Sequence, residues 1–192
     1  YRNLEFFKSQ IMSSQQSEEE KERILSQRMN RAKLTDEQLA VAADMALQAG
    51  IPIASHDDDS PEKLDYVTGS LHAEICEFPV ELEVAKEARR RGMQVVVGAA
   101  NILMGRSHSN NLSALDAIRA GCADILVSDY FPAAILHAVF QLYEQGILSL
   151  PEAVNMAAYH PAKAVKIEDR LGSIEPGKCA DLLLVSKKGP CL

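Results

Sequence analysis

A histidine and three aspartates stand together where an apolar run of the sequence ends. His56 directly follows IPIAS (51–55), and Asp57, Asp58 and Asp59 come next. An imidazole nitrogen and carboxylate oxygens are donors for divalent metals, and an adjacent carboxylate can orient the ring. We therefore predict that His56 and Asp57 are metal ligands, with Asp58 as a further acid that could face the site. The alternative is a helix start before SPEKL, where acids favour the helix dipole, and we assign Asp59 and Ser60 mainly to that role.

A second acid, Asp129, follows the apolar segment ADILVS (123–128). A carboxylate beside a buried strand is costly unless it is paired or bound to a cation. Next to a metal, such a group can be both a ligand and the acceptor of a proton from water. We predict this catalytic and metal-binding role for Asp129. An N-cap for a helix that starts near Pro132 is the alternative, and the sequence leaves it open.

A polar loop, GAANILMGRSHSNNLSALDA (98–117), joins a predicted strand to a predicted helix. Its hydrogen-bonding side chains suit a ligand rich in oxyanions, and Arg106 has the planar fork that fits a phosphate. The substrate-binding residues that we predict here are Asn101, Arg106, Ser107 and His108. Part of the loop is expected only to lead into the following helix, with Asn111 or Ser113 as its N-cap.

The remaining composition narrows the class of protein. The chain has 192 residues, a hydrophobic content of 47% and a net charge of −7, which indicate a folded chain and disfavour nucleic acid or an anionic membrane as partner. Its four cysteines form no CxxC pair, and no apolar run reaches membrane-spanning length, so we expect a cytoplasmic protein. The histidines outside these motifs, His72, His137 and His160, are expected to be structural.

The elements that position these residues alternate between strand and helix. Apolar strands are predicted at about 51–55, 73–78, 94–99 and 124–128, with helices between them, and this pattern indicates a parallel α/β sheet. Polar residues crowd at the carboxyl ends of the strands, and no Gly-rich phosphate loop follows any strand. We predict half of a TIM-type (β/α)8 barrel. Its open edges require cover by further sequence, another chain or rearrangement, so we expect a homo-oligomer.

One segment carries a resemblance to a known family. DRLGSIEPGKCADLLLV (169–185) resembles the C-terminal signature of the amidohydrolase superfamily, and AYHPAKAVKI (158–167) resembles its last barrel helix. The resemblance implies a partial barrel over residues 1–168. It also implies the start of a small β-sandwich over residues 169–192, in which Asp181 leads a strand.

Further motifs resemble a phosphonate-metabolism member of that superfamily: SHDDD, AEICEFPVELEVAKEARRRG, GAAN, the SHSNN loop and DILVSDYFP. This resemblance implies a hydrolase with a divalent metal (zinc, iron or manganese). The implied substrate is a phosphorylated sugar phosphonate, a ribose methylphosphonate 5-triphosphate, cleaved to the 5-phosphate and pyrophosphate. His56 is then a ligand, Asp129 a ligand and proton acceptor, and the residues of the polar loop contact phosphate or sugar.

The chain departs from that pattern in two ways. Ala100, MGR and Asn110 replace a proline, an Arg-Gly-Gly run and a glycine, which bears on the substrate more than on the fold. The superfamily's HxH pair is also absent, so the chain resembles the C-terminal half of the enzyme. Two alternatives therefore remain: an amidohydrolase that opens a cyclic amide or deaminates a base, and a truncated, inactive chain that oligomerises.

Overall fold

The computed structural model describes residues 17–30, 33–105 and 111–186, and it divides the chain into two compact units, residues 1–39 and 40–192. In the first unit, helix α2 (Glu18–Met29) begins at Ser17, whose side chain accepts a hydrogen bond from the Glu20 amide. Helix α3 (Asp36–Gln48) begins with a capping box. The Thr35 hydroxyl accepts from the Gln38 amide, and the Gln38 side chain accepts from the Thr35 amide.

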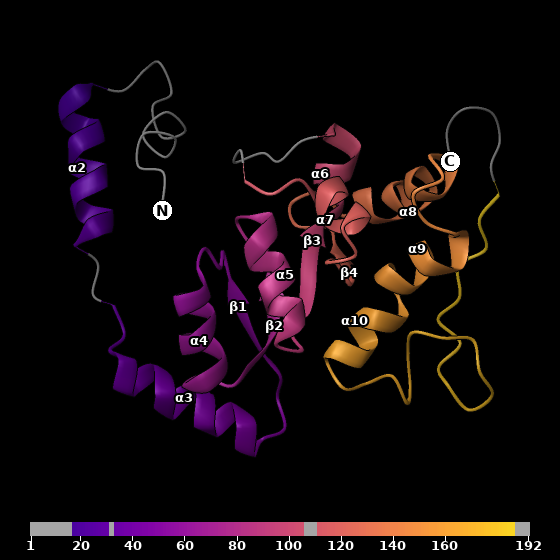
Figure 1. Ribbon diagram of the computed structural model, residues 1–192, viewed down its shortest axis with the longest axis horizontal. Helices are drawn as coiled ribbons and strands as arrows, with labels where there is room; N and C mark the ends of the chain where they lie inside the picture. The colour runs from indigo at the N-terminus through magenta and orange to yellow at the C-terminus, as the bar shows by residue number, and fades with distance from the viewer. Residues whose placement is uncertain (1–16, 31–32, 106–110, 187–192) are drawn as a thin grey trace. The chain divides into compact units, whose positions relative to one another are not determined.

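The second unit is built on a parallel sheet of four strands in the order of the sequence (Figure 1). The strands are β1 (Ile53–His56), β2 (Ala73–Glu77), β3 (Gln94–Gly98) and β4 (Ile125–Val127). They confirm the predicted parallel α/β sheet, with boundaries that shift by one or two residues. The sheet and its helices are consistent with a partial TIM-type barrel.

One face of the sheet is covered by helices that connect the strands. Helices α4 (Pro61–Gly69), α5 (Leu82–Arg90) and α7 (Ala114–Arg119) pack there. Their core includes Leu64, Cys76, Ala85 and Val95, all fully buried. Helix α5 packs on the sheet through one apolar stripe, and its charged residues lie on the opposite side of the helix. The helix ends before Gly92, which has φ +84°.

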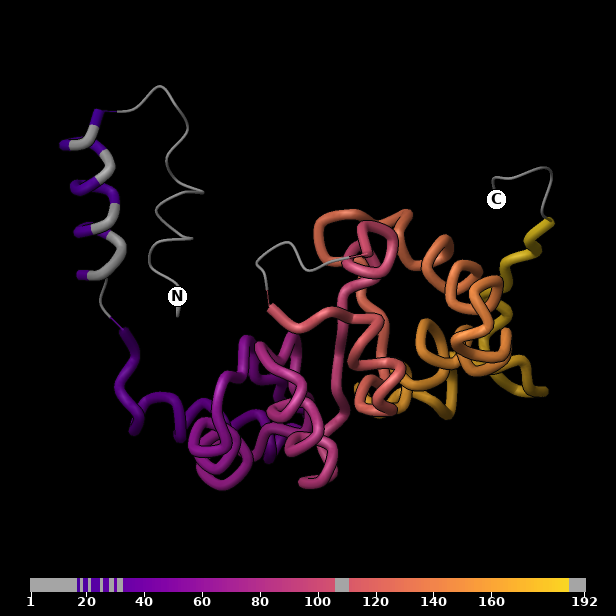
Figure 2. The backbone as a smooth tube through the Cα atoms, turned by 45° about the horizontal axis from the view of Figure 1, so that its top comes forward, coloured from indigo at the N-terminus to yellow at the C-terminus, as the bar shows by residue number. Residues whose placement is uncertain are grey.

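A second apolar cluster joins the β3–β4 end of the sheet to the later helices. It contains Val97 and Leu126 together with residues of α6 (Ala99–Met104), α8 (Ala134–Glu144) and α9 (Leu150–Ala157). Helix α9 starts with a capping box between Ser149 and Glu152. Helices α8 and α9 pack against each other, as neighbouring stretches of the orange tube in Figure 2, and α9 also packs against β4.

The opposite face of the sheet carries a small apolar cluster that helix α10 (Tyr159–Ala164) covers. Ala164 packs there with Ile75, Val96 and Ile125. His160 of the same helix places its Nδ1 2.8 Å from the Asp124 carbonyl oxygen, so it has the structural role expected of it. In a barrel this face would be the inner one, and α10 closes its amino-terminal end.

The sandwich strand expected from Asp181 is not formed. Residues 169–186 contain turns and extended chain without a strand, and Leu182, Leu183 and Leu184 are exposed, the last at 99%. A lone strand is unstable because its backbone groups need a neighbouring strand, and no described segment pairs with this one. The division at residue 168 therefore stays a prediction.

Candidate active site at the carboxyl ends of the strands

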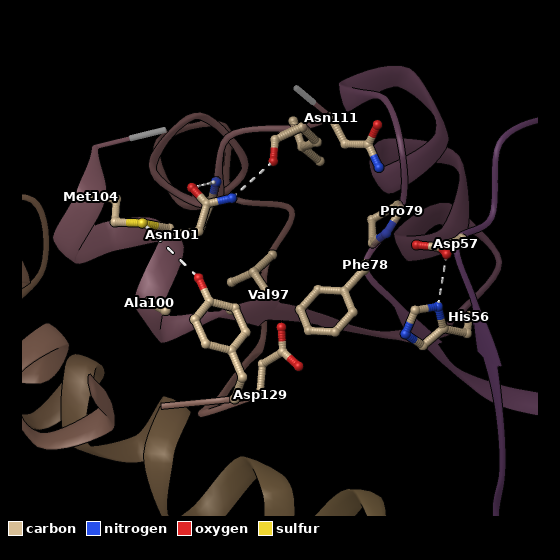
Figure 3. A pocket seen from close by; sticks show the side chains of 14 residues that line it. His56, Asp57, Phe78, Pro79, Val97, Ala100, Asn101, Met104, Asn111 and Asp129 are labelled. Carbon is tan, nitrogen blue, oxygen red and sulfur yellow. Dashed lines mark hydrogen bonds and ion pairs between the residues drawn. The ribbon is translucent and has the colours of Figure 1, made fainter. Parts of the chain in front are cut away.

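A cavity of about 250 Å³ opens at the carboxyl ends of the four strands. Residues that end or follow every strand line it: His56 and Asp57 after β1, Phe78 after β2, Asn101 after β3, and Asp129 after β4. The predicted convergence of these polar residues on one rim is thus present in the geometry (Figure 3). The imidazole of His56 and the carboxylate of Asp129 lie on the same cavity although they belong to the two outer strands of the sheet.

The β1 end presents an imidazole and a carboxylate side by side. His56 Nδ1 lies 3.1 Å from Asp57 Oδ2, and both side chains are more than half exposed. Asp57 has φ +55°, a conformation that aspartate tolerates better than most residues. Because the carboxylate holds Nδ1, the Nε2 atom is the ring nitrogen left for a ligand. This arrangement suits Asp57 to orienting the ring as much as to direct coordination.

The other acids of the SHDDD stretch do not line the cavity. Asp58 is fully buried and its carboxylate accepts a hydrogen bond from the Ser55 hydroxyl, so the prediction that it could face the site is wrong. The left-handed turn at Asp57 reverses the chain and sends the next side chain inward. Ser60 caps α4 by accepting from the Lys63 amide, as expected of a helix start.

Asp129 follows β4 with φ +55° and lines the cavity. The alternative that it caps the next helix is wrong. Helix α8 starts at Ala134 after the N-cap Ala133, and no side chain makes a cap hydrogen bond there. A carboxylate that is held at a cavity rim in a strained backbone conformation, and that has no capping role, is a candidate for chemistry.

Two aromatic residues of the cavity were not predicted from the sequence. The Phe78 ring meets the His56 ring edge-on at a centroid distance of 5.3 Å, and a Cβ on Gly98 would come within 3.3 Å of it. Tyr130 also lines the cavity, with its hydroxyl 4.0 Å from Met104 Sδ. Position could have indicated Tyr130, which directly follows the predicted site residue Asp129, whereas no predicted site residue adjoins Phe78 in the sequence.

Asn101 has a bridging role in the cavity wall. Its amide nitrogen donates to the Leu112 carbonyl at 3.3 Å, and its amide oxygen accepts from the Ala114 amide at 3.1 Å. These bonds tie α6 to the segment that enters α7, where Ser113 is the cap. The other three predicted binding residues, Arg106, Ser107 and His108, lie outside the described residues.

Two of the described cavity side chains could hold a metal ion. His56 and Asp129 offer one nitrogen donor and one carboxylate, a set that suits zinc, iron or manganese. Within the described ranges no group of three or more His, Cys, Asp or Glu side chains is placed to hold a metal. A tight site therefore needs ligands in addition to these two.

The thiol of Cys76, on β2, is not a candidate nucleophile. Burial raises the pKa of Cys76, and a hydrogen bond with Asp58 raises this pKa further. A buried thiol of raised pKa holds little thiolate and is inert.

Comparisons with known proteins agree with this geometry. Residues 18–190 match the model of the amidohydrolase family. The chain is 41% identical over 142 residues to α-D-ribose 1-methylphosphonate 5-triphosphate diphosphatase of Escherichia coli (strain K12), which covers 72% of this chain and 36% of that protein. A match of that length includes His56 and Asp129 wherever it begins. The chain is also 33% identical over 110 residues to adenine deaminase 4 of Rhizobium meliloti (strain 1021), over 52% of this chain and 18% of that protein.

A solved structure supports the fold. The amidohydrolase from Thermotoga maritima MSB8 superposes with a TM-score of 0.59 at 21% identity, over 84% of this chain and 44% of that one. The match to the E. coli diphosphatase shows that the chain spans only about a third of the length of that relative. Among the described residues, no helix combines the length and apolar character needed to cross a membrane.

Proposed function

The chain belongs to the amidohydrolase family, and from that membership we propose that it forms part of a metal-dependent hydrolase that cleaves a phosphoanhydride bond. The substrate we propose is a phosphorylated sugar phosphonate, a ribose 1-methylphosphonate 5-triphosphate, which would yield the 5-phosphate and pyrophosphate. The identity with the E. coli diphosphatase supports this substrate class. The observation that carries the proposal is the placement of His56 and Asp129 on one cavity.

Each residue at this rim has a role that its position allows. His56, through Nε2, and Asp129 would hold a divalent cation, and Asp57 would keep the imidazole oriented. When bound, the cation would supply Lewis acidity toward a phosphoryl oxygen and lower the pKa of water. Asp129 is the carboxylate placed to accept a proton at the cavity.

The charge of the rim argues that a triphosphate needs this cation. Asp57 and Asp129 line the cavity, so its described side chains carry acids where an anionic substrate would enter. These acids would repel an anionic substrate, and a divalent cation between the acids and the substrate would reverse the local field. Arg106, on the polar loop, would contribute a further positive charge.

A chimaera tests the proposal. The aligned segment of this chain replaces its counterpart in the E. coli diphosphatase, and pyrophosphate release from the triphosphate is measured with zinc, iron or manganese. We expect turnover in the chimaera and a loss of at least about 100-fold in His56→Ala and Asp129→Asn. The control is Asp65→Asn, an exposed acid of α4 paired with Arg91. A folded, metal-loaded chimaera that releases no pyrophosphate would refute the assignment.

Deamination of a nucleobase is the second candidate. Phe78 and Tyr130 give the cavity aromatic walls, on which a planar ring could stack, and the similarity to adenine deaminase 4 points the same way. Ammonia release from adenine by the same chimaera, without pyrophosphate release from the triphosphate, would favour this function.

We also propose that another polypeptide segment covers the open edges of the sheet. Strands β1 and β4 each pair on one side only among the described strands, and unpaired parallel strands recruit neighbours. A second copy of the chain is one such neighbour, and light scattering after size exclusion would report it. An oligomer without metal affinity would support instead the inactive, oligomerising chain.

A further inference from the structure

Lys63 stands where helix physics disfavours a cation. It is the third residue of α4, in the first turn, after the cap Ser60 and the helical residues Pro61 and Glu62. The amino-terminal turn of a helix carries partial positive charge, so acids are preferred there and a lysine is unfavourable. A lysine at this position therefore needs compensating contacts.

Three acceptors at the end of β1 compensate it. Lys63 Nζ donates to the carbonyl oxygens of His56 and Asp57, at 2.7 and 3.0 Å, and lies 3.3 Å from Oδ1 of Asp58. Two of the three ammonium N–H bonds are therefore used in hydrogen bonds to backbone carbonyls, and the contact with Asp58 is an ion pair. The two carbonyls belong to the two residues whose side chains face the cavity, so the ammonium fixes the backbone on either side of the left-handed residue Asp57.

The buried Asp58 also contacts Lys63 and ties the turn to neighbouring loops. Its side chain is fully buried, one oxygen accepts from the Ser55 hydroxyl, and the other has no hydrogen bond of its own, with the ammonium of Lys63 beside it. The Asp58 carbonyl also accepts from the Val80 amide at 2.8 Å, and the Val80 carbonyl accepts from the Leu112 amide at 2.8 Å. The turn that Lys63 holds is thus tied to the loops that follow β2 and β3.

We propose that Lys63, with the buried Asp58, is a positioning residue that aims His56 and Asp57 into the cavity. The claim that Lys63 fixes this turn rests on the contacts alone. The claim that the fixed turn serves a metal site rests on the proposed function. Lys63 does not line the cavity, so it acts through the backbone of the turn.

Amide hydrogen exchange of the chain separates this role from ordinary stabilisation. The Asp57 amide donates to the Glu77 carbonyl, and the Phe78 amide donates to the Val96 carbonyl at the equivalent place one strand further on. In Lys63→Met we expect the Asp57 amide to exchange at least about tenfold faster while the Phe78 amide keeps its rate. Lys63→Arg, which keeps the charge and donors, should restore most of the protection. Equal acceleration at both amides, or none at either, would overturn the proposal.

Two further variants exclude the effect of an uncompensated buried charge. Asp58→Asn/Lys63→Met removes both charges, so it should recover the thermal stability that Lys63→Met loses and still show fast exchange at Asp57. Lys86→Met, which breaks the exposed pair with Glu83 on α5, should leave the Asp57 amide unchanged. Slow exchange at Asp57 in the double variant would mean that charge burial alone explains the single one.

Zinc titration tests whether the contacts of Lys63 affect metal binding at His56. Under the proposed function, Lys63→Met should weaken zinc binding by the chimaera about tenfold or more, since the imidazole is no longer held in place. If the chimaera with Lys63 intact binds no zinc, the metal-site part of the proposed function fails, and the exchange result still decides the role of Lys63.

Discussion

Replacing Gly172 by alanine should cost far more stability than the same change at Gly177. Gly172 lies in the segment 169–185 with φ +90°, and a Cβ there would come within 2.7 Å of the Ala162 Cβ and 2.9 Å of the Ala158 carbonyl oxygen. Contacts this short with backbone require the segment to move away from α10. Gly177 has a similar φ of +94°, and a Cβ there meets nothing within 4 Å.

The two substitutions share one cost and differ in the other. A left-handed conformation costs an alanine about 1–2 kcal/mol at either position. Overpacking adds about 1–3 kcal/mol at Gly172 alone. The difference between the variants is therefore about 1–3 kcal/mol, which corresponds to a gap of about 2–12 °C in Tm for a chain of this size.

Urea and thermal unfolding, followed by far-UV circular dichroism, measure this difference. Gly172→Ala should unfold at lower urea and lower temperature than Gly177→Ala, with both below the unmodified chain. Equal losses in the two variants would show that Gly172 does not contact α10, and that residues 169–185 do not pack against this helix.

Three further predictions concern pH, thiol reactivity and the cavity wall. Arg90, the last residue of α5, and the C-cap residue Arg91 hydrogen-bond Glu87 and lower its pKa to about 2. Because the folded-state pKa is lowered, the stabilisation is complete above about pH 4.5 and is lost as the pH falls toward 2. Glu87→Gln should flatten Tm across this window, and an unchanged acid slope would contradict it. A thiol reagent should label the exposed Cys179 first and Cys76 only on unfolding, since burial raises the pKa of Cys76; fast labelling of both in the folded chain would be the opposite result. Asn101→Ala should cost about 1–3 kcal/mol of unfolding free energy, because two hydrogen bonds are lost, and a neutral effect would mean that they are not formed in solution.

Much of the sheet was predictable because its physics is local. Apolar runs that alternate with amphipathic helices indicate parallel strands, and all four predicted strands are present. The meeting of His56 and Asp129 also follows from this pattern, since parallel strands place their carboxyl ends on one rim. Neither inference needed a long-range contact.

The sandwich strand at Asp181 shows where such reasoning stops. DLLLV has the composition of a strand, yet in the described part of the chain it remains extended without pairing. A strand is stabilised by its neighbour rather than by its own residues, and the sequence of one segment does not supply the neighbour. For the same reason, the sequence does not reveal which segment pairs with the outer edges of β1 and β4.

The direction of each rim side chain depended on backbone dihedrals that the sequence did not reveal. Asp57, Phe78 and Asp129, which follow β1, β2 and β4, all have φ near +55°. At Asp57 the side chain stays at the cavity while the next one turns away, as the burial of Asp58 shows, whereas Pro79 and Tyr130, which follow Phe78 and Asp129, line the cavity as well. Aspartate tolerates this conformation and phenylalanine does so poorly. A left-handed Phe78 is therefore the stronger sign that packing around the cavity, against the rings and backbone of the adjacent strands, imposes the geometry of the rim.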